Sequence, residues 1–184
     1  MIGVGGNDKP TCILDIFMEP NSTNYQIRSA KPRDAQSIYD LIVALAIYEK
    51  EPQAVETTPH IICEQMSDPN PPFQCLVAEV EDIIVGFALY FFNYSTWKGQ
   101  RGIYLEDLFV EPKFRQQGIA LALMQSLAEI AQKEQCGRID WSVLRWNQLA
   151  INFYKNIGAS EMHEWIGYRI EGNDIFTLCQ KNRM

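Results

Sequence analysis

The chain has 184 residues, 47% of them hydrophobic, and its formal net charge at pH 7 is −7. This length and composition suit one globular domain with a sizeable core. The acidic balance disfavours a nucleic-acid-binding protein, which needs a basic face, and the longest apolar runs are shorter than the roughly 20 residues of a membrane span.

Turn-forming residues set the start of the chain apart from the rest. We interpret residues 1–24 as an N-terminal extension that adds one strand at residues 12–18. Residues 25–184 are predicted to form a single domain.

A strand and two helices are predicted next. Residues 25–29 alternate like a short strand, and the segment after Pro32 carries apolar residues at helical spacing. Pro52 ends this helix. A second short helix is predicted from Pro59, with Thr58 as its N-cap.

Three strands follow in the middle of the chain. Residues 74–80 and 83–92 are separated by two polar residues, which predicts a hairpin. Residues 93–101 are predicted to form a loop that holds Trp97, and residues 102–110 a further strand.

The last third combines helices and strands. A long helix is predicted for residues 117–135, a strand for residues 138–143 and a helix for residues 148–157. Residues 161–168 and 174–179 are predicted to pair as a final hairpin. This order of elements indicates a mixed α/β fold.

A candidate anion site lies where the strand that ends at Val110 leads into the long helix. The turn has the pattern Arg115-x-x-Gly118-x-Ala120. The first amides of a helix lack intrahelical partners and carry partial positive charge, so they stabilise an anion. Lys113 and Arg115 add positive charge, and the small residues allow close approach. The alternative interpretation is an ordinary helix start that contains a glycine.

Neither a metal site nor a disulfide framework is expected. The five cysteines form no C-x-x-C pair and their number is odd. The two histidines, His60 and His163, are far apart in sequence, so a zinc cluster or a Cys/His nucleophile pair has no support. With no secretory signal recognised at the start of the chain, a cytoplasmic protein is the expectation.

Three spaced motifs resemble the GNAT superfamily of acyl-CoA-dependent N-acyltransferases. They comprise residues 75–80 with 85–92, residues 104–110, and residues 151–159. Together they resemble the diamine acetyltransferase branch, which contains the spermidine/spermine and thialysine N-acetyltransferases. The resemblance covers residues 25–179. It implies a mostly antiparallel central sheet flanked by about four helices, with strands splayed apart at the cofactor site.

The resemblance implies transfer of an acetyl group from acetyl-CoA to a primary amine of a small cationic metabolite. The candidate acceptors are diamines, polyamines and lysine-like amino acids such as thialysine. Tyr154 matches the family's general acid, which protonates the departing thiolate. From its chemistry alone, the favoured role of Tyr154 is a ring packed against the sheet with its hydroxyl in water, and the resemblance reverses that preference.

Two adjacent carboxylates, Glu106 and Asp107, are the candidate acceptor site. In a regular strand they would point to opposite faces, unless a bulge re-aims both. By resemblance, Glu106 accepts the proton of the amine through water, and Glu106, Asp107 and Trp97 bind the substrate. The alternative is a solvated acidic edge.

The resemblance also assigns the acetyl-CoA contacts. Main-chain groups of residues 108–110 would hold the pantetheine arm, and residues 116–120 the pyrophosphate. Asn147 and Lys155 are also predicted to contact the cofactor. The alternative for Asn147 is a helix cap, and the alternative for Lys155 is a solvated charge. The predicted cofactor contacts are Leu108, Phe109, Val110, Arg115, Gln116, Gln117, Gly118, Ile119, Ala120, Asn147, Tyr154 and Lys155.

The sequence departs from the branch at Ser95-Thr96, where the polyamine enzymes carry Asp-Pro. One acidic contact for a long polycation is missing, so a shorter acceptor is at least as well supported. A second departure is Gln116 directly after Arg115, where relatives often have glycine; binding through the backbone should survive it.

Two other functions stay open at this point: a protein or peptide N-acetyltransferase, and a non-catalytic acyl-CoA-binding regulatory module. Members of the branch are typically homodimers with the C-terminal strands at the interface, so a homodimer is expected. No metal, nucleic-acid or membrane partner is predicted.

Overall fold

The computed structural model describes residues 24–181, so the strand predicted at residues 12–18 lies outside the described part. The chain separates into two compact units, Met1–Ser142 and Val143–Met184.

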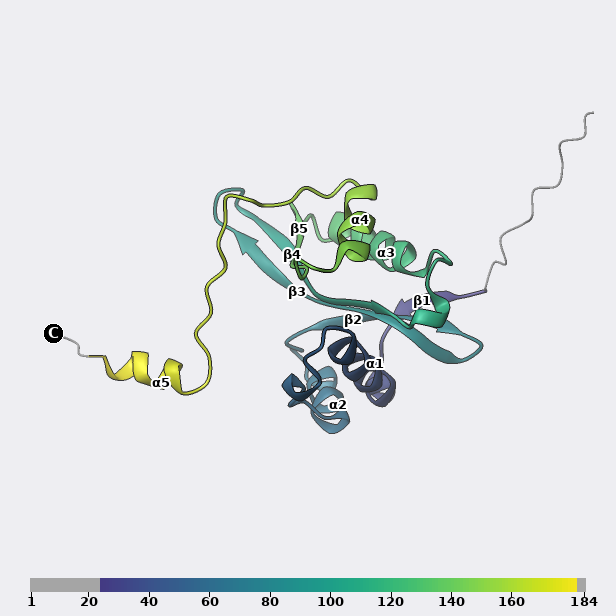
Figure 1. The fold of residues 1–184 in the computed structure, drawn as a ribbon, viewed down its shortest axis with the longest axis horizontal. Coiled ribbons are helices and arrows are strands. Elements are labelled where there is room, and N and C mark those ends of the chain that lie inside the picture. The colour runs from purple at the N-terminus through teal and green to yellow at the C-terminus, as the bar shows by residue number, and fades with distance from the viewer. Residues whose placement is uncertain (1–23, 182–184) are drawn as a thin grey trace, which may run out of the picture. The chain divides into compact units, whose positions relative to one another are not determined.

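Figure 1 labels the helices and strands of both units. In the first unit these are β1 (Gln26–Ser29), α1 (Ala35–Tyr48), α2 (Pro59–Ser67), β2 (Gln74–Val80), β3 (Ile83–Ser95), β4 (Gln100–Val110), α3 (Ile119–Lys133) and β5 (Ile139–Trp141). Short 3-10 helices lie at Pro32–Asp34, Pro52–Ala54 and Pro112–Phe114. The second unit holds α4 (Gln148–Asn156) and α5 (Asn173–Gln180).

The five strands form one sheet in the order β1-β2-β3-β4-β5. All neighbours are antiparallel except β4 and β5, which run parallel. Helices α1 and α2 cover one face of the sheet and α3 covers the other (Figure 1). This is the mixed, mostly antiparallel α/β fold that the sequence predicts.

The core on the α1 face is built from the apolar positions that the helical spacing picks out. Ile38 and Leu41 of α1 are buried, as is Ile62 of α2. They pack against sheet residues such as Phe87 and Phe109. The start of α2 is confirmed as well, since the Thr58 hydroxyl accepts a hydrogen bond from the Ile61 amide at 3.2 Å.

The β2–β3 hairpin is confirmed. Its two turn residues, Glu81 and Asp82, have φ angles of +48° and +65°. This is the left-handed pair of a type I′ turn, whose twist matches that of the strands it joins.

The loop predicted for residues 93–101 is mostly wrong. Strand β3 continues to Ser95 and β4 starts at Gln100, so only four residues form the turn. The reason is cross-strand pairing of Asn93 with Gly102 and of Tyr94 with Arg101, which polar composition alone does not reveal.

The predicted C-terminal hairpin is also wrong. Residues 161–168 contain no strand, and Asn173–Gln180 forms α5. The aromatic side chains that suggested strands are exposed, by 64% at Trp165 and 93% at Tyr168. Without a partner strand the backbone is satisfied locally, as helix, and Asp174 in the first turn favours that choice.

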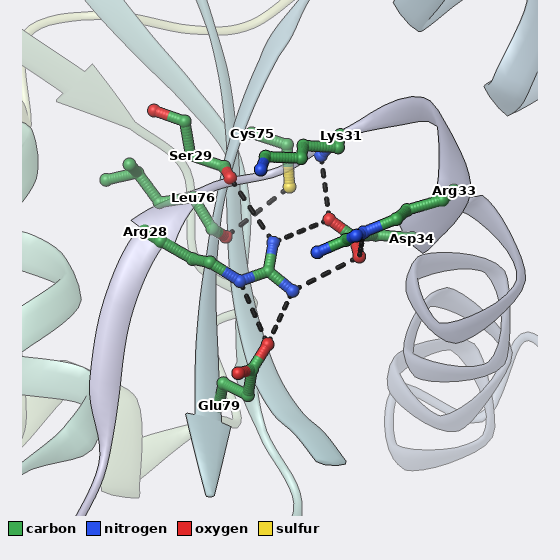
Figure 2. A network of polar contacts seen from close by, with 8 residues as sticks. All are labelled: Arg28, Ser29, Lys31, Arg33, Asp34, Cys75, Leu76 and Glu79. Atoms are coloured by element: carbon green, nitrogen blue, oxygen red, sulfur yellow. Dashed lines mark hydrogen bonds and ion pairs between the residues drawn. The ribbon is translucent and has the colours of Figure 1, made fainter. Parts of the chain in front are cut away.

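A charged network ties β1 to β2 and to the start of α1 (Figure 2). The Arg28 guanidinium donates to Asp34 at 2.6 and 3.1 Å and to Glu79 at 2.5 and 2.9 Å. Asp34 also accepts the Lys31 amide at 2.7 Å. The hydrogen bond from Arg28 is the main cause that holds the pKa of Asp34 below its ordinary value.

We expect Asp34→Asn to destabilise the protein by about 3 kcal/mol, because Arg28 would lose one of its two carboxylate partners in a largely buried setting. The depressed pKa of Asp34 gives stability that is present at neutral pH and lost as the pH falls below about 4. Urea unfolding at pH 7 and pH 3 measures both effects. The matched control is Arg33→Gln. Arg33 lies 3.9 Å from Asp34 and its side chain is 73% exposed, so this substitution should change the free energy of unfolding by less than about 0.5 kcal/mol. A loss for Asp34→Asn that is equal at the two pH values would contradict this account.

Candidate active site

A β-bulge in β4 places the two candidate carboxylates. Leu105 pairs with Tyr90 and Asp107 pairs with Leu89, so Glu106 has no residue opposite it. The register shift therefore inserts Glu106 as the extra residue of a bulge. The sequence allowed both carboxylates one face only with such a bulge, and the structure contains it.

Asp107 lies on the face covered by α1. Its cross-strand partner Leu89 packs against the core cluster of that face. Burial is the main cause that raises the pKa of Asp107 to about 6, and the negative charges of Glu106 and Glu49 contribute to the same rise. Asp107 is half-buried and Glu106 is exposed. Glu106 and Glu49 thus both act on Asp107, and a bound cation would relieve the cost of the Asp107 charge in this setting.

Glu49 is a site residue that the sequence analysis missed. It caps the C-terminal end of α1, where the helix dipole disfavours an anion. Burial raises its pKa above the ordinary value. An acidic residue directly after an apolar helix was the signal that could have identified it.

The edge of β4 beyond the bulge is open toward β5. Pairing between the two strands covers residues 103–105 and stops before Glu106. Within residues 24–181, no strand continues the sheet along the last part of β4. Backbone groups of Leu108, Phe109 and Val110 on this edge could therefore bind an extended chain, as an added strand would.

Arg115 anchors the turn that follows β4. Its Nε donates to the Val110 carbonyl at 2.9 Å. Its guanidinium lies 4.8 Å from the centre of the Tyr48 ring and 5.4 Å from that of Phe109. The side chain thus connects the end of α1, the end of β4 and the turn. Lys113, the other predicted cation, pairs with Glu111 at 3.1 Å.

The turn itself has the backbone of an anion site. Gln116 and Gly118 adopt left-handed φ angles of +61° and +82°. The first hydrogen bond at the start of α3 runs from the Ala122 amide to the Gly118 carbonyl at 2.9 Å, so the three amides between them precede the intrahelical ladder. Alternating backbone of this kind and a helix start are both suited to phosphate oxygens.

The second unit carries the remaining candidates. The side chain of Asn147 accepts the Ala150 amide at 3.2 Å and so caps α4, which is the alternative role considered for it. Tyr154 of α4 is half-buried, with its ring centre 5.4 Å from that of Phe153. Lys155 pairs with Glu161 at 2.9 Å.

Trp97 is not brought together with the carboxylates. It lies in the β3–β4 turn and is 89% exposed. Strand β4 begins at Gln100, and the six further residues to Glu106 span about 20 Å at roughly 3.3 Å each. A short acceptor cannot contact both places in this unit.

Neither a metal-ion cluster nor a membrane-spanning helix occurs in the part of the chain that the structure describes. No group of three or more His, Cys, Asp or Glu side chains there is arranged to hold a metal ion. None of the helices there has the length and apolar composition of a membrane span.

The comparisons with known proteins point to one family. Residues 35–159 match the acetyltransferase (GNAT) family. The chain is 37% identical to the thialysine N-epsilon-acetyltransferase of Mus musculus, over 84% of this chain and 96% of that protein. It is 35% identical to the spermidine/spermine N(1)-acetyltransferase-like protein 1 of Homo sapiens, over 83% of this chain and 23% of that protein.

A solved structure resembles the chain over most of its length. An integron cassette protein from the mobile metagenome of V. cholerae is 29% identical and superimposes with a TM-score of 0.72, over 85% of this chain and 98% of that one. The chain therefore belongs to the acetyltransferase (GNAT) family and is an acyltransferase.

Proposed function

We propose that the protein transfers the acetyl group of acetyl-CoA to a primary amine of a small cationic metabolite. The candidates are diamines, polyamines and lysine-like amino acids. The observation that carries this proposal is the bulge at Glu106 and Asp107, just upstream of the turn proposed to bind an anion, with Glu49 close enough to raise the pKa of Asp107. The similarity to thialysine and spermidine/spermine acetyltransferases supports the same acceptor class.

The open edge of β4 and the following turn form the proposed cofactor site. Backbone groups of residues 108–110 would bind the pantetheine arm, and the amides of residues 116–120 the pyrophosphate. Asn147 at the N-terminus of α4 and Tyr154 and Lys155 within it are proposed as further cofactor residues from the similarity to the family. The cofactor supplies a thioester, whose carbonyl carbon is the electrophile.

The residues proposed for chemistry handle two protons. The neutral amine nitrogen forms a bond to the carbonyl carbon as the bond from carbon to sulfur breaks. Glu106 takes, through water, the proton that the ammonium form loses to become this neutral amine. The nitrogen loses a second proton as the amide forms, and this proton replaces the one that the Tyr154 hydroxyl gives to the thiolate. Asp107 holds the ammonium form of the acceptor before reaction.

We also propose that residues 25–184 work as one acetyltransferase domain, since the family match at residues 35–159 extends into both compact units. A homodimer is proposed on the same similarity. The apolar side chains exposed in the tail, 64% at Trp165 and 71% at Phe176, favour an interface there.

The test is a screen of acceptors with acetyl-CoA, in which the release of free thiol measures turnover. Diamines, polyamines, thialysine, lysine, aminoglycosides and peptides with free N-termini should be compared at equal concentration. Turnover restricted to small cationic amines is expected. Turnover with the peptides alone would favour a protein acetyltransferase, and CoA binding without turnover would favour a binding module.

A further prediction separates two roles for Arg115. If its contacts with Tyr48 and Val110 position the β4 edge, Arg115→Met lowers kcat/KM about tenfold both for acetyl-CoA and for acetyl-pantetheine, which lacks the pyrophosphate. Tyr48→Leu should act in the same direction, and the double variant should lose less than the sum. A loss confined to acetyl-CoA would make Arg115 a direct phosphate ligand instead. The control is Lys113→Met, which removes a nearby exposed charge.

A further inference from the structure

We propose that Phe91 and Tyr104 determine acceptor specificity by binding the second, non-reacting cationic group of a diamine. This inference rests on the proposed role of Glu106 and Asp107 and deepens it. Phe91 and Tyr104 are direct cross-strand partners on β3 and β4. Their ring centres are 5.3 Å apart, with the ring planes tilted by 31°.

The aromatic pair lies on the same face of the sheet as Asp107. Side chains two residues apart on a strand share a face, and so do cross-strand partners. Phe91 shares the face of Leu89, and Leu89 is the partner of Asp107. Leu89 packs against the core cluster under α1 and α2, whereas Phe91 and Tyr104 are half-buried and do not belong to that cluster. The pair therefore borders the covered part of the face on the side of the β3–β4 turn.

The spacing fits a second cationic group. Two residues along a strand span about 7 Å, which is the distance between the Phe91 and Leu89 positions. Because Asp107 lies opposite Leu89, the ring pair is about the same distance from Asp107. A short diamine could place one nitrogen at Asp107 and the other over the rings. Aromatic faces attract cations by about 0.5 to 2 kcal/mol. The carboxylates of Glu49, Glu106 and Asp107 add a negative potential that favours a doubly charged acceptor.

Two contacts support this use of the rings. The Tyr104 hydroxyl forms a hydrogen bond with the Ser142 hydroxyl at 3.0 Å, which holds the ring before any ligand arrives. On the neighbouring position of β3, the Arg101 guanidinium lies 4.8 Å from the centre of the Phe92 ring, so this hairpin already binds a cation on an aromatic face. Trp97, the aromatic residue that the sequence predicts for substrate binding, lies in the β3–β4 turn and is too far from Asp107 to act beside it.

The experiment compares 1,5-diaminopentane with pentylamine, which has the same chain but a single nitrogen. Phe91→Leu and Tyr104→Leu should each raise KM for the diamine about fivefold, which corresponds to about 1 kcal/mol, and leave KM for pentylamine and both kcat values within about twofold. Tyr104→Phe keeps the ring and should keep the preference. Trp97→Leu is the matched aromatic control and should change neither KM.

Equal losses for the two amines, or a larger loss in Trp97→Leu, would overturn the inference. Circular dichroism checks the fold of each variant, and if Tyr104→Leu does not fold, the Phe91→Leu comparison decides. If the wild type acetylates neither amine, the proposed function fails for this acceptor class, and calorimetric Kd values for the two amines then test the aromatic pair separately. Diamine binding that is independent of Phe91 would overturn it in that case.

Discussion

Replacing Tyr154 by phenylalanine is expected to lower kcat about 100-fold while the Kd for CoA changes less than about twofold. The substitution removes only a hydroxyl from α4, so the helix and the ring contact with Phe153 are retained. The variant can no longer donate a proton to the thiolate, and a positioned general acid increases the rate by about 10²- to 10⁴-fold. Single-turnover kinetics with a saturating amine measures this step directly.

The control for that variant is Tyr168→Phe. Tyr168 lies in the same unit and is 93% exposed, so loss of its hydroxyl should leave kcat unchanged. A thioester whose thiol has a lower pKa needs less help in leaving, and the deficit of Tyr154→Phe should shrink with it. Full activity of Tyr154→Phe with acetyl-CoA would remove Tyr154 from its assigned role.

Asp107→Asn is expected to lower kcat/KM for a cationic amine about 100-fold and to stabilise the protein at pH 8. The activity falls because an amide cannot balance the ammonium charge. Burial raises the pKa of Asp107 to about 6, so its stability contribution is present at low pH and lost as the pH rises through that value. The amide avoids this cost, which amounts to about 1 to 3 kcal/mol for a shift of about two pKa units.

Denaturant unfolding at pH 5 and pH 8 measures the stability effect, and steady-state kinetics the activity. The gain in stability should be larger at pH 8. Asp82→Asn is the matched control, because Asp82 is an exposed carboxylate in the β2–β3 turn and its left-handed φ of +65° also suits asparagine. Unchanged activity, or a loss of stability at pH 8, would show that Asp107 is structural.

The parts of the fold that the sequence predicts are those set by local chemistry. The Thr58 cap, the two-residue turn at Glu81 and Asp82, and the helix that starts after Gly118 each follow from the residues at one place in the chain. The turn between β4 and α3, which we propose as the cofactor turn, belongs to the same class. Its pattern is a short string whose geometry depends on its own backbone.

The parts that the sequence does not predict depend on contacts distant in the chain. The effect of Glu49 on Asp107 and the stacking of Arg115 on Tyr48 arise only when α1 packs beside the end of β4. The hairpin predicted for residues 161–168 and 174–179 was wrong for a related reason. Its aromatic residues have strand propensity, but propensity decides a strand only when a neighbouring strand is present to pair with it.

The central claim is acetyl transfer from acetyl-CoA to a small cationic amine, and mass spectrometry of the products tests it most directly. The wild-type protein is incubated with acetyl-CoA and, in separate reactions, 1,5-diaminopentane, thialysine and spermidine, and product and free CoA are both quantified. We expect a mono-acetylated amine in equal amount to the CoA released for at least one acceptor, and little of either with Tyr154→Phe over the same time. CoA release without an acetylated amine, or no reaction with any of the three while CoA binds, would contradict the claim.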